Sequence, residues 1–372
     1  GLGGQGAGLL TTDDRRASPG AHVTAETPIY LDHNATTPIL PEVVDAMLPY
    51  LREHFGNPSS GHVYGRRAHD AVERARGQVA ALLGCDDGEV IFTSGGTEAN
   101  NLAIRGVAEA RNDRRHVVTT AIEHPATEQP CAWLERHGMR LSRIGVDVDG
   151  RARVEEARAA IDAATALVSV MHSNNETGVL QPIAEFAGLA HAAGAILHTD
   201  AAQSAGKVPL DVSKLGVDLL SVAGHKLYAP KGVGALYVRR GTPMVPFVLG
   251  AGHERGLRPG TENVAAIVGL GQACEIAGSD METVAARMAA LRDDLWQRLA
   301  AAVPGVMLNG HRTLRLPNTL NVRFPRVSGN AILEGAPAIA ASTGSACHAG
   351  GESASVVILA MGVAAEGAIG SI

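Results

Sequence analysis

Cysteine, aromatic residues and clustered positive charge are all scarce in this chain of 372 residues. Its 4 cysteines are too few and too scattered for a disulfide framework, and no C-x-x-C pair indicates a zinc site. We therefore expect a reducing, cytoplasmic environment and no metal. Aromatic residues make up only 3% of the chain, so the core must consist mainly of Ala, Val, Leu and Ile.

Nucleic acid and membrane lipid are poor candidates for partners. The formal net charge is -6, and no lysine or arginine tract offers a footprint for an anionic polymer or surface. No apolar run approaches the ~20 residues that a membrane span needs, and residues 1–24 lack a signal-peptide core. A small-molecule substrate is the expectation that remains.

From Pro41 onward, short apolar runs alternate with longer helical patterns, which is typical of an α/β fold with a largely parallel sheet. The predicted strands are 90–93, 116–120, 166–171, 195–199, 219–222 and 234–238, and the predicted helices are 66–83, 98–109, 125–137, 154–163 and 183–192. We expect a flexible arm over 1–25 and a large domain over 26–280, of which residues 26–40 pack on the small domain. The smaller α+β C-terminal domain covers 281–372, with a helix from Met281 to Ala302 and strands near 319–324 and 338–342.

A lysine lies just beyond one of these strands. Lys226 follows the run that begins at Asp218, with His225 before it and a glycine-rich turn after it. The strand 195–199 leads into Asp200 and then Gln203. A lysine amine can hold an aldehyde cofactor and an acid can pair with a protonated pyridine nitrogen, so this combination predicts pyridoxal 5'-phosphate (PLP) on Lys226. Each residue alone is more often a surface charge or a helix N-cap.

Three further features follow strands in the same way. The segment from Ser94 through Gly96 and Thr97 passes from a strand into a helix, which leaves backbone N–H groups free to bind an anion. An ordinary N-cap formed by Ser94 or Thr97 is the alternative. His124 follows the strand ending at Thr120 and could stack on a flat ring, although such histidines are commonly structural. Asn175 could hydrogen-bond a ring oxygen.

From about Tyr30 to Gly362 the chain resembles the cysteine desulfurases and selenocysteine lyases, PLP enzymes of the class V aminotransferase type. The resemblance rests on strings in a matching order and spacing: Tyr30-Leu-Asp-His-Asn-Ala-Thr-Thr-Pro38, Gly56-Asn-Pro-Ser-Ser60, Thr93-Ser-Gly-Gly-Thr-Glu98, Asn174-Asn-Glu-Thr-Gly178, His198-Thr-Asp-Ala-Ala-Gln203, Gly224-His-Lys226, Arg258-Pro-Gly-Thr-Glu-Asn263 and Ser342-Thr-Gly-Ser-Ala-Cys347. It implies the fold of type I PLP-dependent transferases and a homodimer.

The resemblance also implies a role for individual positions. The residues that would contact the cofactor are Lys226 as its attachment point, His124 stacked on the ring, Asp200 on the pyridine nitrogen, Gln203 and Asn175 near the ring hydroxyl, Gly96, Thr97 and His225 at the phosphate, and Thr261 at the phosphate from the second subunit. Cys347, in a small and polar segment, would be the nucleophile. Cys85, Cys131 and Cys274 fit buried, inert thiols better.

The implied reaction takes L-cysteine to L-alanine and leaves the sulfur on Cys347 as a persulfide, from which an acceptor protein would take it. Lys226 would move the substrate Cα proton, with help from burial that lowers its pKa. L-Selenocysteine is the alternative substrate, with release of selenium, and His348 beside Cys347 weakly favours that branch.

Two positions depart from the family pattern. Ala223 stands where desulfurases often have serine, which removes one phosphate hydrogen bond worth about 1 kcal/mol. The segment that ends at Ile372 offers no counterpart of the arginine that binds the substrate carboxylate. We therefore keep two further alternatives, a fragment of a longer protein and a PLP-fold relative without turnover.

Overall fold

A seven-stranded sheet forms the centre of the computed structural model, which describes residues 27–343 and 353–372. The strands lie in the order β2-β8-β7-β6-β5-β3-β4. They are β2 (Val90–Thr93), β3 (His116–Thr120), β4 (Arg140–Ile144), β5 (Thr165–Ser169), β6 (Ile196–Asp200), β7 (Leu219–Ala223) and β8 (Gly234–Val238). β8 alone runs opposite in direction to the other strands of this sheet, so the predicted, mostly parallel sheet is confirmed.

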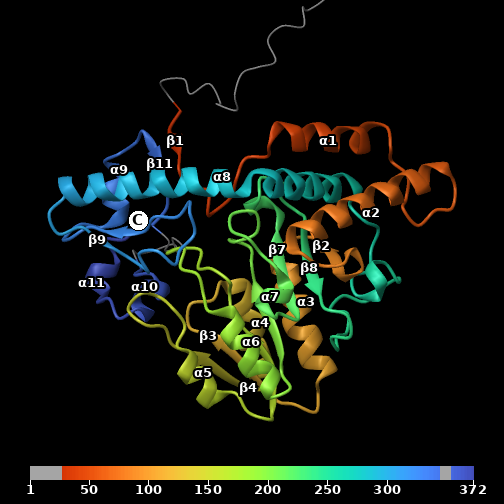
Figure 1. Ribbon diagram of the computed structural model, residues 1–372, viewed down its shortest axis with the longest axis horizontal. Helices are drawn as coiled ribbons and strands as arrows, with labels where there is room; N and C mark the ends of the chain where they lie inside the picture. Colours follow the sequence, from red (N-terminus) through yellow and green to blue (C-terminus); the bar gives the residue numbers. More distant parts are fainter. Residues whose placement is uncertain (1–26, 344–352) are drawn as a thin grey trace, which may run out of the picture.

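Helices cover both faces of this sheet (Figure 1). They include α2 (Val63–Leu83), α3 (Gly96–Ala110), α4 (Pro125–Arg136), α5 (Val154–Ala160), α6 (Ile183–Ala192) and the one-turn α7 (Val212–Leu215). Leu167 and Leu219 join the core with α3 and α4, whereas their neighbours Val168 and Leu220 join the core with α2 and α6. Successive side chains of a strand point to opposite faces, so continuously apolar strands are buried on both sides.

One long helix, α8 (Val264–Ala302), runs past the sheet and continues to the C-terminal elements (Figure 1). At one end it lies against α1 (Pro41–Arg52) and α2. Around its other end lie β9 (Met307–Leu308), β10 (Val322–Arg323), α9 (Gly329–Glu334), β11 (Ile339–Ala340), α10 (Val356–Ala360) and α11 (Ala365–Ala368). The short strand β1 (Ile29–Tyr30) pairs in parallel with β11. Residues far apart in the sequence therefore meet at this end of the molecule.

The prediction that the long helix begins at Met281 is wrong. The helix begins at Val264, and its first half contains Gly269 and Gly271, which are poor helix formers. A Cβ atom at Gly269 would lie 2.7 Å from the Met47 sulfur, and one at Gly271 would lie 2.7 Å from the Cα atom of Ala75. These glycines therefore allow α8 to pack closely on α1 and α2, and this packing outweighs their low helix propensity.

Candidate functional site

The carboxyl ends of the parallel strands bring three of the predicted residues to one edge of the sheet. Asp200 is the last residue of β6, His124 follows β3, and Lys226 ends the one-turn helix η2 (Gly224–Lys226) after β7. Partial burial lowers the pKa of both His124 and Lys226, and the charge of Asp200 opposes this in both cases. The three groups thus interact electrostatically, as expected for side chains that share one site.

Asn34 connects several of the predicted residues. The Lys226 Nζ atom donates a hydrogen bond to the Asn34 carbonyl oxygen and another, 2.7 Å long, to that of Ala35. Gln203 donates to the same Asn34 carbonyl at 2.9 Å, and the Asn34 side chain donates to the Asn175 carbonyl at 3.1 Å. Asn34 was not among the predicted site residues, although it lies inside one of the quoted strings.

Asp200 is held by a second asparagine that the sequence analysis also missed. The Asp200 carboxylate is only 7% exposed and accepts hydrogen bonds from the Asn100 side chain at 2.7 Å and the Ala202 N–H at 2.9 Å. Asn100 lies on α3, one helical turn after Gly96. This spacing was the feature of the sequence from which its place in the site could have been predicted. These donors fix the position of the carboxylate, a group suited to pair with a protonated ring nitrogen.

The N-terminus of α3 is open. Its N-cap residue is Gly95, whose φ of 148° favours glycine, and no side chain caps the helix. The alternative in which Ser94 or Thr97 caps the helix is therefore not observed. A Cβ atom at Gly96 would lie 3.1 Å from the Ala223 Cβ atom, so the glycine keeps this turn clear beside η2. Exposed N–H groups at the positive end of a helix dipole are suited to binding an anion.

His124 has one structural contact and an exposed ring. It is the N-cap residue of α4, and its Nδ1 atom accepts a 3.1 Å hydrogen bond from the Ala126 N–H. The structural role that such histidines often have is therefore present at one ring nitrogen. The residue as a whole is only partly covered, which leaves the ring available for stacking.

His225 lies beside Lys226 and contacts the N-terminal segment. Its Nδ1 atom lies 3.1 Å from the Thr36 hydroxyl, a contact that the sequence analysis did not predict. Partial burial, followed by the charge of Lys226, lowers the pKa of His225 to about 4. The imidazole is therefore neutral at neutral pH. Thr261 is exposed on the segment before α8, and Cys347 lies outside the described residues.

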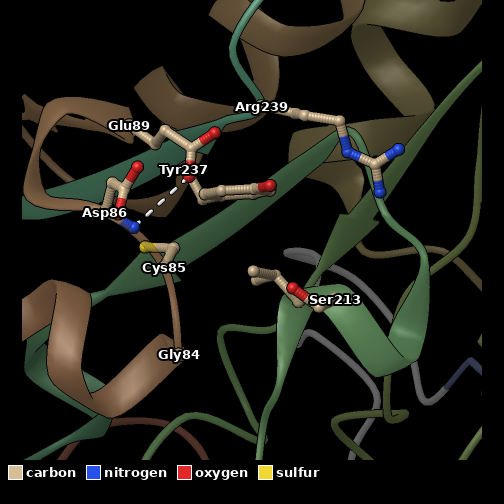
Figure 2. A pocket seen from close by; sticks show the side chains of 8 residues that line it. Gly84, Cys85, Asp86, Glu89, Ser213, Tyr237 and Arg239 are labelled. Atoms are coloured by element: carbon tan, nitrogen blue, oxygen red, sulfur yellow. Dashed lines mark hydrogen bonds between the residues drawn. The ribbon is translucent and has the colours of Figure 1, made fainter.

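The other three cysteines are unreactive thiols. Burial raises the pKa of Cys274 to about 12 and that of Cys131 still further. Cys85 lines a hollow of about 560 Å³ beside Asp86 and Glu89 (Figure 2), and burial together with these acidic neighbours raises its pKa to about 12. Because the thiolate is the nucleophile, none of these three is suited to attack a substrate.

The helices and side-chain clusters of the described residues provide neither of two further kinds of site. None of these helices is long and apolar enough to cross a membrane. In the same part of the chain, no group of three or more His, Cys, Asp and Glu side chains is placed to hold a metal ion.

Known proteins resemble this chain over most of its length. The family model for class V aminotransferases matches residues 29–364. Cysteine desulfurase 2 of Trichormus variabilis is 49% identical over 337 residues, which cover 90% of this chain and 84% of the relative. A solved structure described as a NifS-like protein has a TM-score of 0.86 and 36% identity, covering 93% of this chain and 92% of its own. Another, described as SspA in complex with cysteine, has a TM-score of 0.83 and 34% identity, covering 93% and 97% of the two chains. The chain therefore belongs to the class V aminotransferase family, in the branch that contains the cysteine desulfurases.

Proposed function

We propose that this protein is a PLP-dependent cysteine desulfurase, which converts L-cysteine to L-alanine and transfers the sulfur to Cys347. The observation that carries the proposal is the meeting of Lys226, Asp200 and His124 at one sheet edge, beside the open N-terminus of α3. The match to cysteine desulfurases over 90% of the chain supports the same activity.

The residues of the site fit PLP in three respects. The open helix end that begins at Gly96 offers N–H donors to a phosphate, and the buried Asp200 carboxylate suits a protonated pyridine nitrogen. Lys226 supplies the amine for the aldehyde. Ala223 contributes a methyl group beside Gly96 where a hydroxyl would add one hydrogen bond, so we expect somewhat weaker phosphate binding without loss of the site.

Bound PLP would supply an electron sink that makes the substrate Cα proton acidic. The protein's part is to orient the substrate and to move this proton. Burial lowers the pKa of Lys226, although Asp200 and Asp32 oppose the shift, and a lowered pKa leaves more of the amine neutral and able to accept the proton. The contacts of its Nζ atom with the Asn34 and Ala35 carbonyls hold the amine at the site.

Cys347 is our proposed sulfur acceptor. Its thiolate would attack the substrate sulfur, so that an S–S bond forms as the C–S bond breaks. The electron pair of the C–S bond would remain with the carbon skeleton, which takes up a proton at that carbon and leaves as alanine. The high pKa values of the thiols of Cys85 and Cys274 support the assignment, because neither provides a thiolate near neutral pH.

An absorption spectrum before and after addition of L-cysteine, with alanine and sulfide quantified, tests the proposal. Wild type should show the visible band of lysine-bound PLP, which Lys226→Ala should lack. Cys347→Ala should keep the band and form no alanine. A folded wild type that binds PLP and forms no alanine from cysteine would instead be a PLP-fold relative without turnover.

The names of the relatives do not favour selenocysteine lyase, the alternative substrate assignment. Alanine formation from L-cysteine and from L-selenocysteine, measured side by side, checks the preference. We expect efficient turnover of cysteine, and a strong preference for selenocysteine would contradict our assignment.

A homodimer is part of the same proposal. Phe55 is 79% exposed, Leu249 is 85% exposed, and the ring of Phe55 stacks on that of Tyr64 at 5.6 Å. Between the segments that carry these residues lies a hollow of about 730 Å³, lined in part by His253 and Glu262. Exposed apolar side chains beside a hollow are typical of an interface, and a second copy would explain why Thr261 faces outward. Sedimentation equilibrium measures the association directly.

We also propose a cytoplasmic location and a protein that receives the persulfide sulfur. The free thiols of Cys85, Cys131 and Cys274 support a reducing compartment. Transfer of radiolabelled sulfur from the loaded enzyme to proteins of a cell extract would reveal the acceptor, and Cys347→Ala is the matched control.

A further inference from the structure

A carboxylate lies in the first turn of the helix that is proposed to bind the cofactor phosphate. Glu98 is on α3, and its Oε2 atom accepts a 2.9 Å hydrogen bond from the Ser94 N–H. Burial acts to raise the pKa of Glu98, yet the hydrogen bonds from Arg258 and Ser94 bring it below its usual value. The group is therefore ionised. A negative charge at this position opposes the binding of an anion to the same helix end.

Arg258 neutralises this charge. Its Nε atom lies 2.9 Å from the Glu98 Oε1 atom, and the side chains are only 27% and 15% exposed. Because the pair is partly buried, water and salt screen it less than a surface pair. Arg258 comes from a segment 160 residues away in the sequence, so its position depends on how that segment is held.

The segment begins with an unusual turn. Glu254 and Arg255 both adopt left-handed conformations, with φ of 46° and 56°, and Gly256 follows with φ of 80°. Left-handed backbone is unfavourable for residues with a side chain and persists only where the surroundings fix it. The turn forms the one-turn helix η3 (Glu254–Gly256), which is separated from Arg258 by Leu257 alone.

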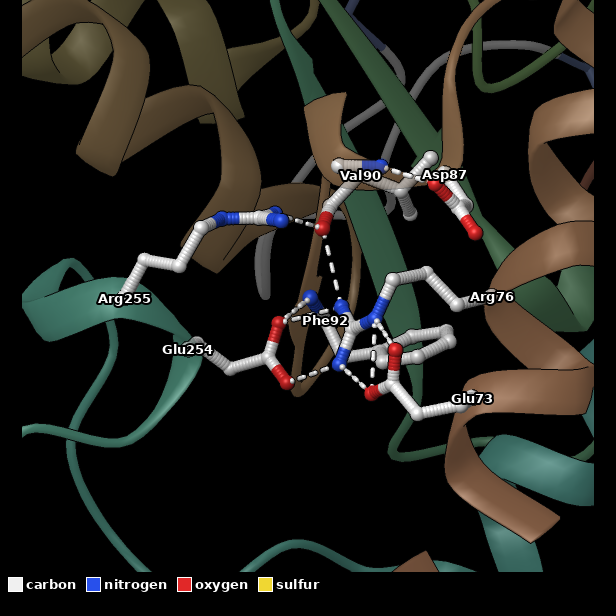
Figure 3. A network of polar contacts seen from close by, with 8 residues as sticks. Glu73, Arg76, Asp87, Val90, Phe92, Glu254 and Arg255 are labelled. Carbon is white, nitrogen blue, oxygen red and sulfur yellow. Dashed lines mark hydrogen bonds and ion pairs between the residues drawn. The ribbon is translucent and has the colours of Figure 1, made fainter. Parts of the chain in front are cut away.

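The surroundings of this turn are a buried cluster of polar contacts on β2 (Figure 3). The Glu254 carboxylate accepts two hydrogen bonds of 2.8 Å from Arg76 of α2 and one of 2.7 Å from the Phe92 N–H. Arg255 and Arg76 both donate to the Val90 carbonyl oxygen. Strand β2 leads directly into Gly95, so the turn is attached to the strand that also carries the anion-binding turn.

We infer that Arg258 is a positioning residue of the anion site. The turn at Glu254, which its buried contacts hold in place, positions Arg258 where its charge cancels that of Glu98. The inference rests on the proposed function, because the anion concerned is the cofactor phosphate. It assigns Arg258 an indirect effect on phosphate affinity that acts through Glu98. The left-handed turn then serves to place the Arg258 guanidinium beside the first turn of α3.

Phosphate binding to Arg258→Met, Glu98→Gln and the double variant tests the inference. The affinities of the full chain for PLP, by equilibrium dialysis, and for inorganic phosphate, by competition, are both measured, so that one readout does not depend on turnover. Arg258→Met leaves the Glu98 charge uncompensated and should weaken both ligands about tenfold. Glu98→Gln should bind at least as well as wild type, and the double variant, whose pair like that of wild type carries no net charge, should bind about as well as wild type.

A different pattern would overturn the inference. If the double variant is as weak as Arg258→Met, the arginine contacts the anion directly or only supports the fold, and the charge of Glu98 is irrelevant. Weakened binding in Glu98→Gln would be equally contradictory. Thermal unfolding identifies variants that fail to fold, and Arg258→Lys, which retains the charge, should then bind nearly as well as wild type. Arg240→Met removes the exposed pair with Asp86 and serves as the matched control. A folded wild type that binds neither ligand would refute the proposed function itself.

Discussion

Asn100 and Asp200, exactly one hundred positions apart in the sequence, are joined by a 2.7 Å hydrogen bond in the buried part of the site. The Asn100 side chain also donates to the Thr127 hydroxyl at 3.2 Å, while its own oxygen has no partner among the described residues. Both protons of the amide are therefore used, and the one that bonds Asp200 helps to orient its carboxylate.

Asn100→Ala should weaken cofactor binding and destabilise the fold. The substitution removes a donor from a buried carboxylate, which costs about 1–3 kcal/mol in the free energy of unfolding. Urea unfolding measures the loss of stability, and equilibrium dialysis with PLP measures the loss of affinity. Asn101→Ala, at the next position of the same helix, is the matched control. An unchanged PLP affinity in folded Asn100→Ala would show that Asp200 needs no such support.

Arg76→Met should be among the most destabilising single changes outside the site. It leaves the Glu254 carboxylate, whose side chain is 2% exposed, without its charged partner, and breaking a buried pair costs about 3–5 kcal/mol. Adding Glu254→Gln should recover part of this loss, because the stranded charge is then removed. Arg298→Ala disrupts the exposed pair with Asp294 and should cost about 0–1 kcal/mol. Equal losses from Arg76→Met and Arg298→Ala in urea unfolding would refute this account.

Lys207 makes the free energy of unfolding depend on pH between about 7 and 10.4. Burial, with a smaller contribution from the charge of Lys226, lowers the pKa of Lys207 to about 7. The unfolded state, with a lysine pKa of about 10.4, then binds more protons between these values, so stability rises with pH across this window. Lys207→Met should be stabilised relative to wild type near pH 7, and the difference should shrink towards pH 10. Denaturant unfolding at several pH values measures this slope, and the exposed Lys231→Met should leave it unchanged.

Glu176 contributes a pH dependence of the opposite sign. Burial raises its pKa to about 7, although a hydrogen bond from the Ser355 hydroxyl opposes the shift. The folded state then binds more protons than the unfolded state between about pH 4.3 and 7, so stability falls as the pH rises through this window. Glu176→Gln should remove this fall. The stability of the variant relative to wild type should therefore be higher at about pH 8 than at about pH 5. Glu185→Gln, at an exposed position of α6, is the control.

Strands and helices with a clear periodic pattern were predictable from the sequence. The bounds of β2, α6 and β8 match the predicted ranges, because each is an apolar run or period flanked by polar or turn residues. Strand β4 was missed. It pairs only with β3 at the edge of the sheet, and its exposed Arg140 and Arg143 give it no continuous apolar run. Helix α1, which begins with Pro41 and contains Pro49, was also absent from the prediction.

The order of residues along the chain was sufficient to predict a site residue wherever that residue directly follows a parallel strand. Lys226, Asp200 and His124 were found in this way, since parallel strands end at a common edge. Asn34 was not predicted, because Lys226 and Gln203 donate to its main-chain carbonyl oxygen. Every residue type has such an oxygen, so the sequence gives no signal for this role. The roles of all these residues stay predictions until the variants are measured.

Helix α8 has a mechanical consequence for the molecule. At 1.5 Å per residue, its 39 residues form a rod of roughly 60 Å with no interruption at the expected boundary near residue 280. A flexible linker would let the large domain and the C-terminal elements rotate independently. A continuous helix instead transmits rotation and tilt from one of its ends to the other. Any movement of the residues that α8 itself carries must therefore bend or tilt the helix as a whole, and its close packing on α1 and α2, which Gly269 and Gly271 allow, restrains that movement.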